Sequence, residues 1–159
     1  MDKIYSLKGK TAWITGGKRI GQKVAELFAK NGADLVLSSR DSDEEAESAL
    51  KRASKFGIKS MALKVDVSSR DDVFAAVTQI KKKFKKIDIL VLMASVFEPV
   101  ELTSISEEHF KSSFDAHVLG TFWPVQASLG LMPRGSSGSS RENCVSLNQN
   151  TSLIEAPPI

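Results

Sequence analysis

The sequence predicts an α/β fold with a doubly wound parallel sheet. Short, almost entirely apolar segments alternate with longer segments in which apolar residues recur every three or four positions, the pattern of buried strands and amphipathic helices. Strands that are apolar on both faces are typical of parallel sheets covered by helices on both sides, and right-handed crossovers make such a sheet doubly wound. A glycine-rich turn between the first strand and the first helix supports the same fold.

Strand–helix repeats are expected over residues 8–128. Three short segments rich in apolar residues, 11–15, 35–39 and 61–65, predict the first three strands. Residues 87–93 are apolar at all but one position and predict the fourth. Because each is short and separated from the next by a helical segment, all four are expected to lie parallel in one sheet.

The helices between these strands are predicted from their caps and apolar stripes. Asn31 and Gly32 are expected to end the first helix, and Ser42 and Ser69 to cap the second and third. The residues expected to face the sheet are Ile20, Val24, Leu27 and Phe28 in the first helix, Ala46, Leu50, Ala53 and Phe56 in the second, and Val73, Val77, Ile80 and Phe84 in the third.

The second part of the chain is expected to begin with a long helix at 106–128, in which Pro124 predicts a kink or break. The Gly/Ser-rich stretch 133–141 is interpreted as a loop, and a last strand is expected at 143–148. We therefore expect a single dinucleotide-binding domain over residues 1–159. The sequence stops in a proline-containing tail, so we expect the fold to be truncated at its C-terminus.

Composition excludes several classes of protein. A net charge of +3 is small, and the single cysteine, Cys144, excludes an intramolecular disulfide and a cysteine-based zinc site. No apolar run approaches the ~18 residues of a membrane span, and the first residues lack the apolar core of a signal peptide. We therefore expect a cytoplasmic protein with neither nucleic acid nor membrane as a partner. The lysines within 81–86 are interpreted as the solvated end of a helix, where the dipole favours cations.

The glycine-rich turn carries the strongest functional signal. It reads Thr-Gly-Gly-Lys-Arg-Ile-Gly over residues 15–21, and glycines at a helix N-terminus let the backbone approach a pyrophosphate. The literal G-x-G-x-x-G pattern is not met, and a tight turn without a ligand is the alternative. The residues expected to bind a cofactor here are Gly16, Gly17, Lys18, Arg19, Ile20 and Gly21.

This turn resembles the Thr-Gly-x-x-x-Gly-x-Gly motif of the short-chain dehydrogenase/reductase family, with one residue deleted and Arg19 at the place of the middle glycine. The resemblance implies a Rossmann-like fold and extends over the whole chain. Asp66 and Val67 resemble the family's adenine-binding pair. Ala94 and Ser95 match the second half of its Asn-Asn-Ala-Gly motif, and the resemblance places them close to the ribose.

The end of the second predicted strand bears on the choice of cofactor. Arg40 follows Ser39 at the point where an acidic residue would bind the ribose hydroxyls of NAD, whereas a basic residue accommodates the 2′-phosphate of NADP. With Lys18 and Arg19 nearby, the sequence predicts NADP(H). Binding of NAD through Asp41 is one alternative, and a surface ion pair of Arg40 without any nucleotide is another.

The catalytic residues of the family are not found in this chain. Relatives use a serine, an asparagine and a Tyr-x-x-x-Lys pair, but the single tyrosine is Tyr5 and no Tyr-x-x-x-Lys occurs. The resemblance places His117 at the asparagine position and Gln149 in the serine segment, so no catalytic set is complete. A packed or hydrogen-bonded role in its helix is expected for His117.

Three functions are compatible with these observations. The first is an NADP(H)-dependent oxidoreductase that transfers hydride between the nicotinamide and a small carbonyl or alcohol, with its catalytic pair outside this chain. The second is a non-catalytic nucleotide-binding or interaction protein, and the third a remnant that folds poorly. The resemblance also implies a homodimer or homotetramer through the helix at 106–128.

Overall fold

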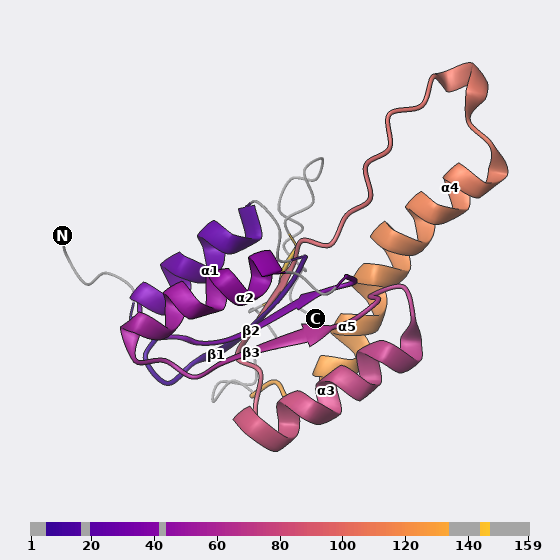
Figure 1. Cartoon of the computed structure of the whole chain (residues 1–159). Helices are drawn as coiled ribbons and strands as arrows, with labels where there is room; N and C mark the ends of the chain where they lie inside the picture. Colours follow the sequence, from indigo (N-terminus) through magenta and orange to yellow (C-terminus); the bar gives the residue numbers. More distant parts are fainter. Residues whose placement is uncertain (1–5, 17–19, 42–43, 134–143, 147–159) are drawn as a thin grey trace.

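The computed structural model describes residues 6–16, 20–41, 44–133 and 144–146. Five strands form one parallel sheet in the order β3-β2-β1-β4-β5 (Figure 1). This confirms the predicted α/β fold with a Rossmann-like parallel sheet. The strands are β1 (Thr11–Thr15), β2 (Asp34–Ser39), β3 (Ser60–Lys64), β4 (Ile89–Leu92) and β5 (Cys144–Ser146).

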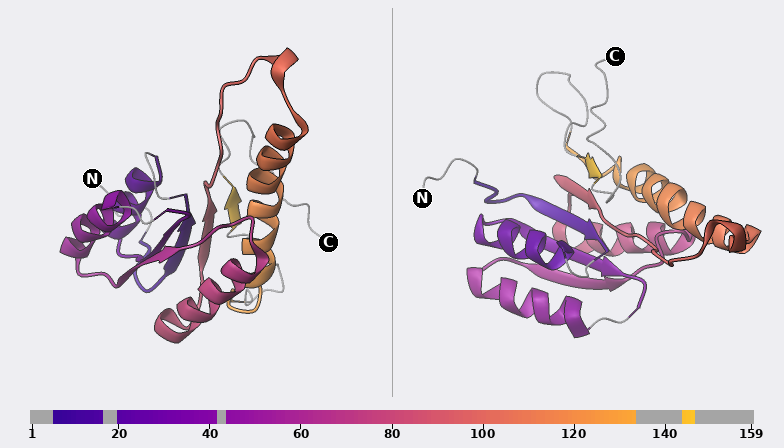
Figure 2. Two further views of the ribbon diagram at one scale, coloured as in Figure 1. Left: turned by 45° about the vertical axis from the view of Figure 1, so that its right-hand side comes forward. Right: turned by 90° about the horizontal axis from the view of Figure 1, so that it is seen from above.

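Helices cover both faces of the sheet (Figures 1 and 2). One layer contains α1 (Ile20–Lys30) and α2 (Glu44–Ala53), and the other contains α3 (Arg70–Phe84) and α5 (Gly120–Ser128). Alternate residues of a strand point to opposite faces, so Ala12 and Ile14 pack under α1 while Trp13 packs under α3. The Trp13 ring is fully buried, and its Nε1 donates to Ser38 Oγ at 3.0 Å.

The buried face of α1 differs from the prediction. Ile20 and Leu27 were expected in the core, but they are 51% and 57% exposed. The buried positions are instead Gly21, Ala25 and Ala29, flanked by the partly buried Val24 and Phe28. Small side chains let the helix axis approach the sheet, which turns the larger residues at the edges of this stripe outward.

The second and third helices largely follow the sequence. All four residues expected to bury on α3 do so, and Ser69 accepts a hydrogen bond from Asp72 N at 3.3 Å as its N-cap. Phe56 was expected to bury but is 45% exposed, because α2 ends at Ala53 and passes into the short 3₁₀ turn η1 (Ser54–Phe56). The predicted cap Ser42 lies outside the described residues.

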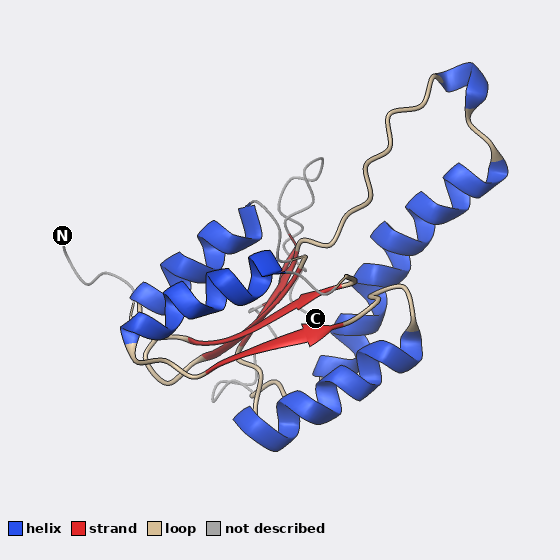
Figure 3. Ribbon diagram, in the orientation of Figure 1, coloured by secondary structure: helices blue, strands red, loops and turns tan. Residues whose placement is uncertain are grey.

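The predicted long helix consists of α4 (Glu107–Phe114), the π-helical turn η3 (Asp115–Leu119) and α5 (Figure 3). The helix does not break at Pro124, because α5 runs through the proline. The irregularity lies one turn earlier, where Gly120 N donates to Asp115 O. Gly120 packs tightly there, since a Cβ on it would lie 2.8 Å from Val67 Cγ2.

An arm formed by residues 93–114 extends away from the sheet (Figures 1 and 2). It contains the loop after β4, the turn η2 (Leu102–Ser104) and α4. Its apolar side chains are strongly exposed, with Phe97 at 89% and Phe110 at 68%. None of the helices in the described ranges is long and apolar enough to cross a lipid bilayer.

Candidate nucleotide-binding edge

The carboxyl ends of four strands meet along one edge of the sheet. Next to β1, Gly16 N donates to Ser38 O on β2 at 2.9 Å, and Met93 N donates to Thr15 O at 3.1 Å. On the side of β2 that faces β3, Val65 N donates to Ser39 O at 2.8 Å.

These hydrogen bonds fix the order of the predicted site residues. Ala94, Gly16, Arg40 and Asp66 follow one another across β4, β1, β2 and β3. At a strand spacing of ~4.8 Å, the three intervals span about 14 Å.

Gly16 and Gly21 form a turn that admits no side chain. Gly16 has φ +76°, and a Cβ on it would lie 2.5 Å from Met93 O and 2.6 Å from Ala94 N. A Cβ on Gly21 would lie 2.4 Å from Gly16 O. The first turn of α1 therefore lies against Gly16 at the end of β1. The first N–H groups of a helix have no partner within the helix and are free to bind an anion. This geometry fits a bound pyrophosphate.

The other residues of the glycine-rich turn are only partly described. Gly17, Lys18 and Arg19 lie outside the described residues. Ile20 opens α1 and is half exposed rather than packed into the core. Its side chain is therefore accessible beside the N-terminus of the helix.

At the end of β2, Ser39 and Arg40 differ in their surroundings. Ser39 Oγ donates to Asp41 O at 2.8 Å, which fixes the local turn. Arg40 is exposed, and no described residue forms an ion pair or hydrogen bond with its guanidinium. The surface ion pair considered as an alternative is thus not found in the described part of the chain. A guanidinium placed in this way can bind a phosphate with two parallel hydrogen bonds.

At the end of β3, Asp66 shapes its own loop. Its Oδ1 accepts hydrogen bonds from Ser68 N at 2.9 Å and from Ser68 Oγ at 2.6 Å. This arrangement leads the chain into the cap of α3. Val67 packs on Gly120 of α5, a contact that ties the predicted adenine position to the opposite helix layer. The sequence carried a signal for it, because a glycine inside a helix often marks a close approach.

The segment after β4 is tied to the helix layer by His117. Its Nε2 donates to Val96 O at 3.2 Å across 21 residues of sequence. This confirms that His117 is a hydrogen-bonded helix residue. Ala94 is half-buried and Ser95 is exposed. These two residues, which are expected near the ribose, lie in the chain between Met93, which contacts Gly16, and Val96, which His117 contacts. Sequence patterns gave no indication of the His117–Val96 pair.

The catalytic positions remain incomplete. Gln149 and Tyr5 lie outside the described residues. Within the described part of the chain, no group of three or more His, Cys, Asp or Glu side chains could hold a metal ion. His109 is partly buried and caps α4, where its Nδ1 accepts from Ser106 N at 3.2 Å.

The opposite edge of the sheet holds a buried charge. Asp88 is 2% exposed and accepts a hydrogen bond from Thr11 N at 2.8 Å. Its carboxylate also contacts Lys86 Nζ at 2.8 Å and Lys10 Nζ at 3.4 Å. Burial raises the pKa of Asp88, but the hydrogen bonds from Lys86 and Thr11 and the two positive charges outweigh it. The pKa therefore lies below its ordinary value of 3.8.

A doubly wound parallel sheet with a glycine turn at its carboxyl edge is the architecture of Rossmann-like proteins. Residues 10–140 match the family model described as short chain dehydrogenase. Because this match covers most of the chain, the protein belongs to the short-chain dehydrogenase family, a family of oxidoreductases.

Two curated relatives illustrate the match. An uncharacterized oxidoreductase of Methylorubrum extorquens is 32% identical over 135 residues, which are 84% of this chain and 54% of the relative. The 17-beta-hydroxysteroid dehydrogenase 13 of Rattus norvegicus is 36% identical over 134 residues, 84% of this chain and 44% of the relative. The chain thus spans about half the length of these relatives.

Solved structures agree with this likeness. A short chain dehydrogenase from Burkholderia cenocepacia, crystallised in complex with NADP, superposes with a TM-score of 0.76 at 27% identity, covering 80% of this chain and 53% of that one. A short-chain type dehydrogenase/reductase from Mycobacterium marinum has a TM-score of 0.76 at 28% identity, covering 82% and 54%.

Proposed function

We propose that this chain binds NADP(H) along the carboxyl edge of its sheet. The observation that carries the proposal is the meeting of Gly16, Gly21 and the exposed Arg40 at neighbouring strand ends. The glycine turn and the N-terminus of α1 would hold the pyrophosphate. Asp66 and Val67 would flank the adenine, and Ala94 and Ser95 the nicotinamide ribose. The neighbour crystallised with NADP supports the same class of ligand.

Discrimination for NADP(H) would come from Arg40. Its guanidinium would bind the 2′-phosphate, with Ser39 holding the turn through its bond to Asp41 O. Lys18 and Arg19 would add positive charge from the neighbouring turn. A carboxylate at position 40 would instead favour the ribose hydroxyls of NAD.

In family members with the full catalytic set, the bound nicotinamide would donate a hydride to a carbonyl or accept one from an alcohol. We infer that this chain contributes nucleotide binding and that turnover on a small carbonyl substrate requires groups it lacks, since the sequence contains no Tyr-x-x-x-Lys. The second candidate is a non-catalytic nucleotide-binding or interaction protein. The engagement of His117 with Val96 O favours it, because that side chain is used in holding a loop.

Assembly would use the helical segment at 106–128. Phe110, Phe114, Val118 and Phe122 recur at intervals of four residues and are 46–68% exposed. A homodimer or homotetramer formed through this stripe would cover apolar surface that is otherwise in contact with water. We propose that this occurs in the cytoplasm.

Titration of the 159-residue chain with NADPH and with NADH tests the proposed function. Nicotinamide fluorescence and the melting temperature Tm should be followed in the same samples. We expect a rise in both signals with NADPH and a much weaker response with NADH. No response to either nucleotide, in a chain that melts cooperatively, would contradict the proposal. Measurable reduction of carbonyl compounds by this chain alone would contradict the inference about turnover.

A further inference from the structure

Lysines gather at the end of the molecule opposite the nucleotide edge. Helix α3 closes with lysines at 81–83, followed by Lys85 and Lys86. Lys83 Nζ donates to Ser60 O at 2.8 Å, so the end of α3 lies against the start of β3. The amino ends of the parallel strands and the last turns of the helices thus share one side of the fold.

Loops at the same end bring further lysines beside these. Lys8 lies against the turn after Lys30, since a Cβ on Gly32 would be 3.3 Å from Lys8 Cα. Lys59 N donates to Asp34 Oδ1 at 2.8 Å, and Lys55 precedes it in the turn η1.

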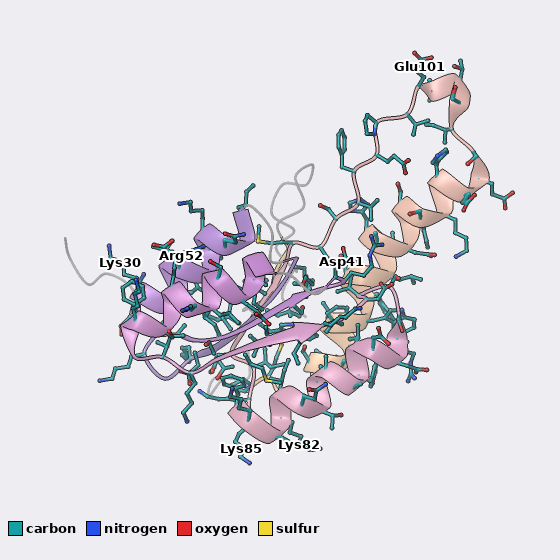
Figure 4. The ribbon with its side chains drawn as sticks, viewed as in Figure 1. Lys30, Asp41, Arg52, Lys82, Lys85 and Glu101 are labelled. Atoms are coloured by element: carbon teal, nitrogen blue, oxygen red, sulfur yellow. The ribbon has the colours of Figure 1, made fainter. Side chains whose placement is uncertain are left out.

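Lys10 connects the lysines of the loops with those that follow α3. Lys10 O accepts from Asp34 N at 2.8 Å, and Lys10 shares the buried Asp88 with Lys86. The set therefore forms a continuous surface, which we call the lysine end. Figure 4 shows Lys30, Lys82 and Lys85 on the side away from the arm that carries Glu101.

The charge of this surface is far from the average of the chain. The ten lysines named above stand against two acidic residues, Asp34 and Asp88, which gives this set a charge of +8. The whole chain carries +3, so the remainder carries −5. Within the described part, only Lys10 and Lys86 of the ten form ion pairs. Helix dipoles favour the lysines at the ends of the helices, but Lys8 and Lys59 follow no such rule.

Lys85 supplies an independent observation. It has φ +70°, and it is the one residue other than glycine with positive φ in the described ranges. It ends α3 as a left-handed cap, a conformation that glycine adopts freely and a lysine does not. A charged side chain therefore occupies a position where the backbone favours glycine. Strain of this kind points to a role for the side chain itself.

Contrary to the sequence-based expectation of no membrane partner, we propose that the lysine end docks on an anionic lipid surface through phosphate and carboxylate headgroups. Lysine ammonium groups are compact point charges that suit a diffuse anionic surface. Phe56 and Leu27 stand beside Lys55 and Lys30 and are 45% and 57% exposed, so they can enter the headgroup boundary.

A flat bilayer fits these observations better than a single-stranded nucleic acid. Single-stranded nucleic acid is bound along a groove with successive aromatic stacking platforms, and the lysine end offers Phe56 alone among the exposed aromatic residues described there. The guanidinium of Arg52, in the last turn of α2, donates to Ser48 and Gln22, so two of its nitrogens are already engaged within the protein. Docking in this orientation leaves the nucleotide edge at the other ends of the strands free to bind its ligand.

Co-sedimentation with vesicles tests the proposal. The chain should bind phosphatidylcholine vesicles that contain phosphatidylserine, release them at high salt, and ignore pure phosphatidylcholine. The double variant Lys82→Glu with Lys85→Glu should lose about tenfold or more in vesicle affinity, because each lysine near such a surface contributes roughly 1 kcal/mol. The matched control, Lys23→Glu with Lys64→Glu, changes the net charge by the same amount at positions outside the lysine end. It should bind the vesicles far better than the Lys82/Lys85 variant.

Lys85→Gly separates binding from folding. It should raise Tm by relaxing the left-handed cap while weakening vesicle binding. Equal losses in the two double variants, absence of binding to phosphatidylserine vesicles, or tighter binding to single-stranded RNA at the same salt would each overturn the proposal.

Discussion

Gly16 lies so close to Met93 that a single methyl group would bring them into collision, with Cβ 2.5 Å from Met93 O. The end of β1 and the end of β4 thus meet through backbone alone. This contact sets the distance between the glycine turn and the segment that carries Ala94, and it gives the candidate site its shape.

Gly16→Ala should abolish NADPH binding and destabilise the fold. The matched control is Gly9→Ala, because Gly9 has the same φ of +76° but no atom within 4 Å of its Cβ position. The left-handed conformation destabilises both variants by about 1–2 kcal/mol, and only Gly16→Ala adds a backbone clash. Thermal unfolding and NADPH titration measure the two effects. Equal losses of Tm and affinity in both variants would refute the clash as the cause.

Arg40→Asp should reverse the preference between nucleotides. Loss of the guanidinium removes a charge-assisted contact to the 2′-phosphate, so NADPH affinity should fall about tenfold or more. NADH affinity should hold or improve, because the new carboxylate can accept from the ribose hydroxyls. Arg40→Lys serves as control and should retain part of the preference. Equal changes for both nucleotides would remove the 2′-phosphate assignment.

His117→Leu should loosen the segment after β4. The hydrogen bond to Val96 O is worth about 1 kcal/mol, so NADPH affinity should fall several-fold and residues 94–100 should become easier to cleave in limited proteolysis. His117→Asn keeps a side-chain donor and should restore part of both properties. Unchanged cleavage in His117→Leu would show that the histidine does not hold this segment.

Gly120→Ala should destabilise the contact between α5 and the end of β3. The added Cβ would lie 2.8 Å from Val67 Cγ2, an overlap of a kind that costs typically ~1–3 kcal/mol. Val67→Ala should relieve it, so the double variant should be more stable than the sum of the single changes predicts. Denaturant unfolding of the four proteins measures the coupling. Simple additivity would mean that the two residues do not interact.

The lowered pKa of Asp88 predicts that the fold loses stability in acid. Its pKa is lower in the folded than in the unfolded chain, so ionised Asp88 stabilises the fold above the ordinary value of 3.8. That contribution disappears as the pH falls through the folded-state pKa. Below pH 4 the Tm of Asp88→Asn should therefore depend less steeply on pH than that of the parent chain. Parallel curves would contradict the role of the buried carboxylate.

The strands and the glycine turn were predictable because their signals are local. Apolar runs marked β1 to β4, and the spacing of Gly16 and Gly21 marked the turn. The buried face of α1 was not predictable, because its buried residues are small, whereas the large residues Ile20 and Leu27 dominate the apolar pattern of the sequence. Local propensity favoured large side chains, whereas close helix–sheet packing favoured small ones.

Long-range contacts were beyond sequence patterns. His117 and Val96 meet only because the arm returns along α4, and no periodicity records that. The lysine end likewise joins residues before β1 with the ends of α1 and α3, which become neighbours only in a parallel sheet. The lysines at 81–86 were correctly placed at a helix end, but their companions came from other parts of the chain.

The most direct test of the account is a backbone amide NMR map of the chain with and without NADPH. Shifts should concentrate at Gly16, Gly21, Arg40 and Asp66, with Ala94 at their far side, and should leave the lysine end unchanged. Saturable shifts of this pattern would place the nucleotide on the carboxyl edge of the sheet. A spectrum unchanged by NADPH, or shifts confined to the lysine end, would contradict the central claim.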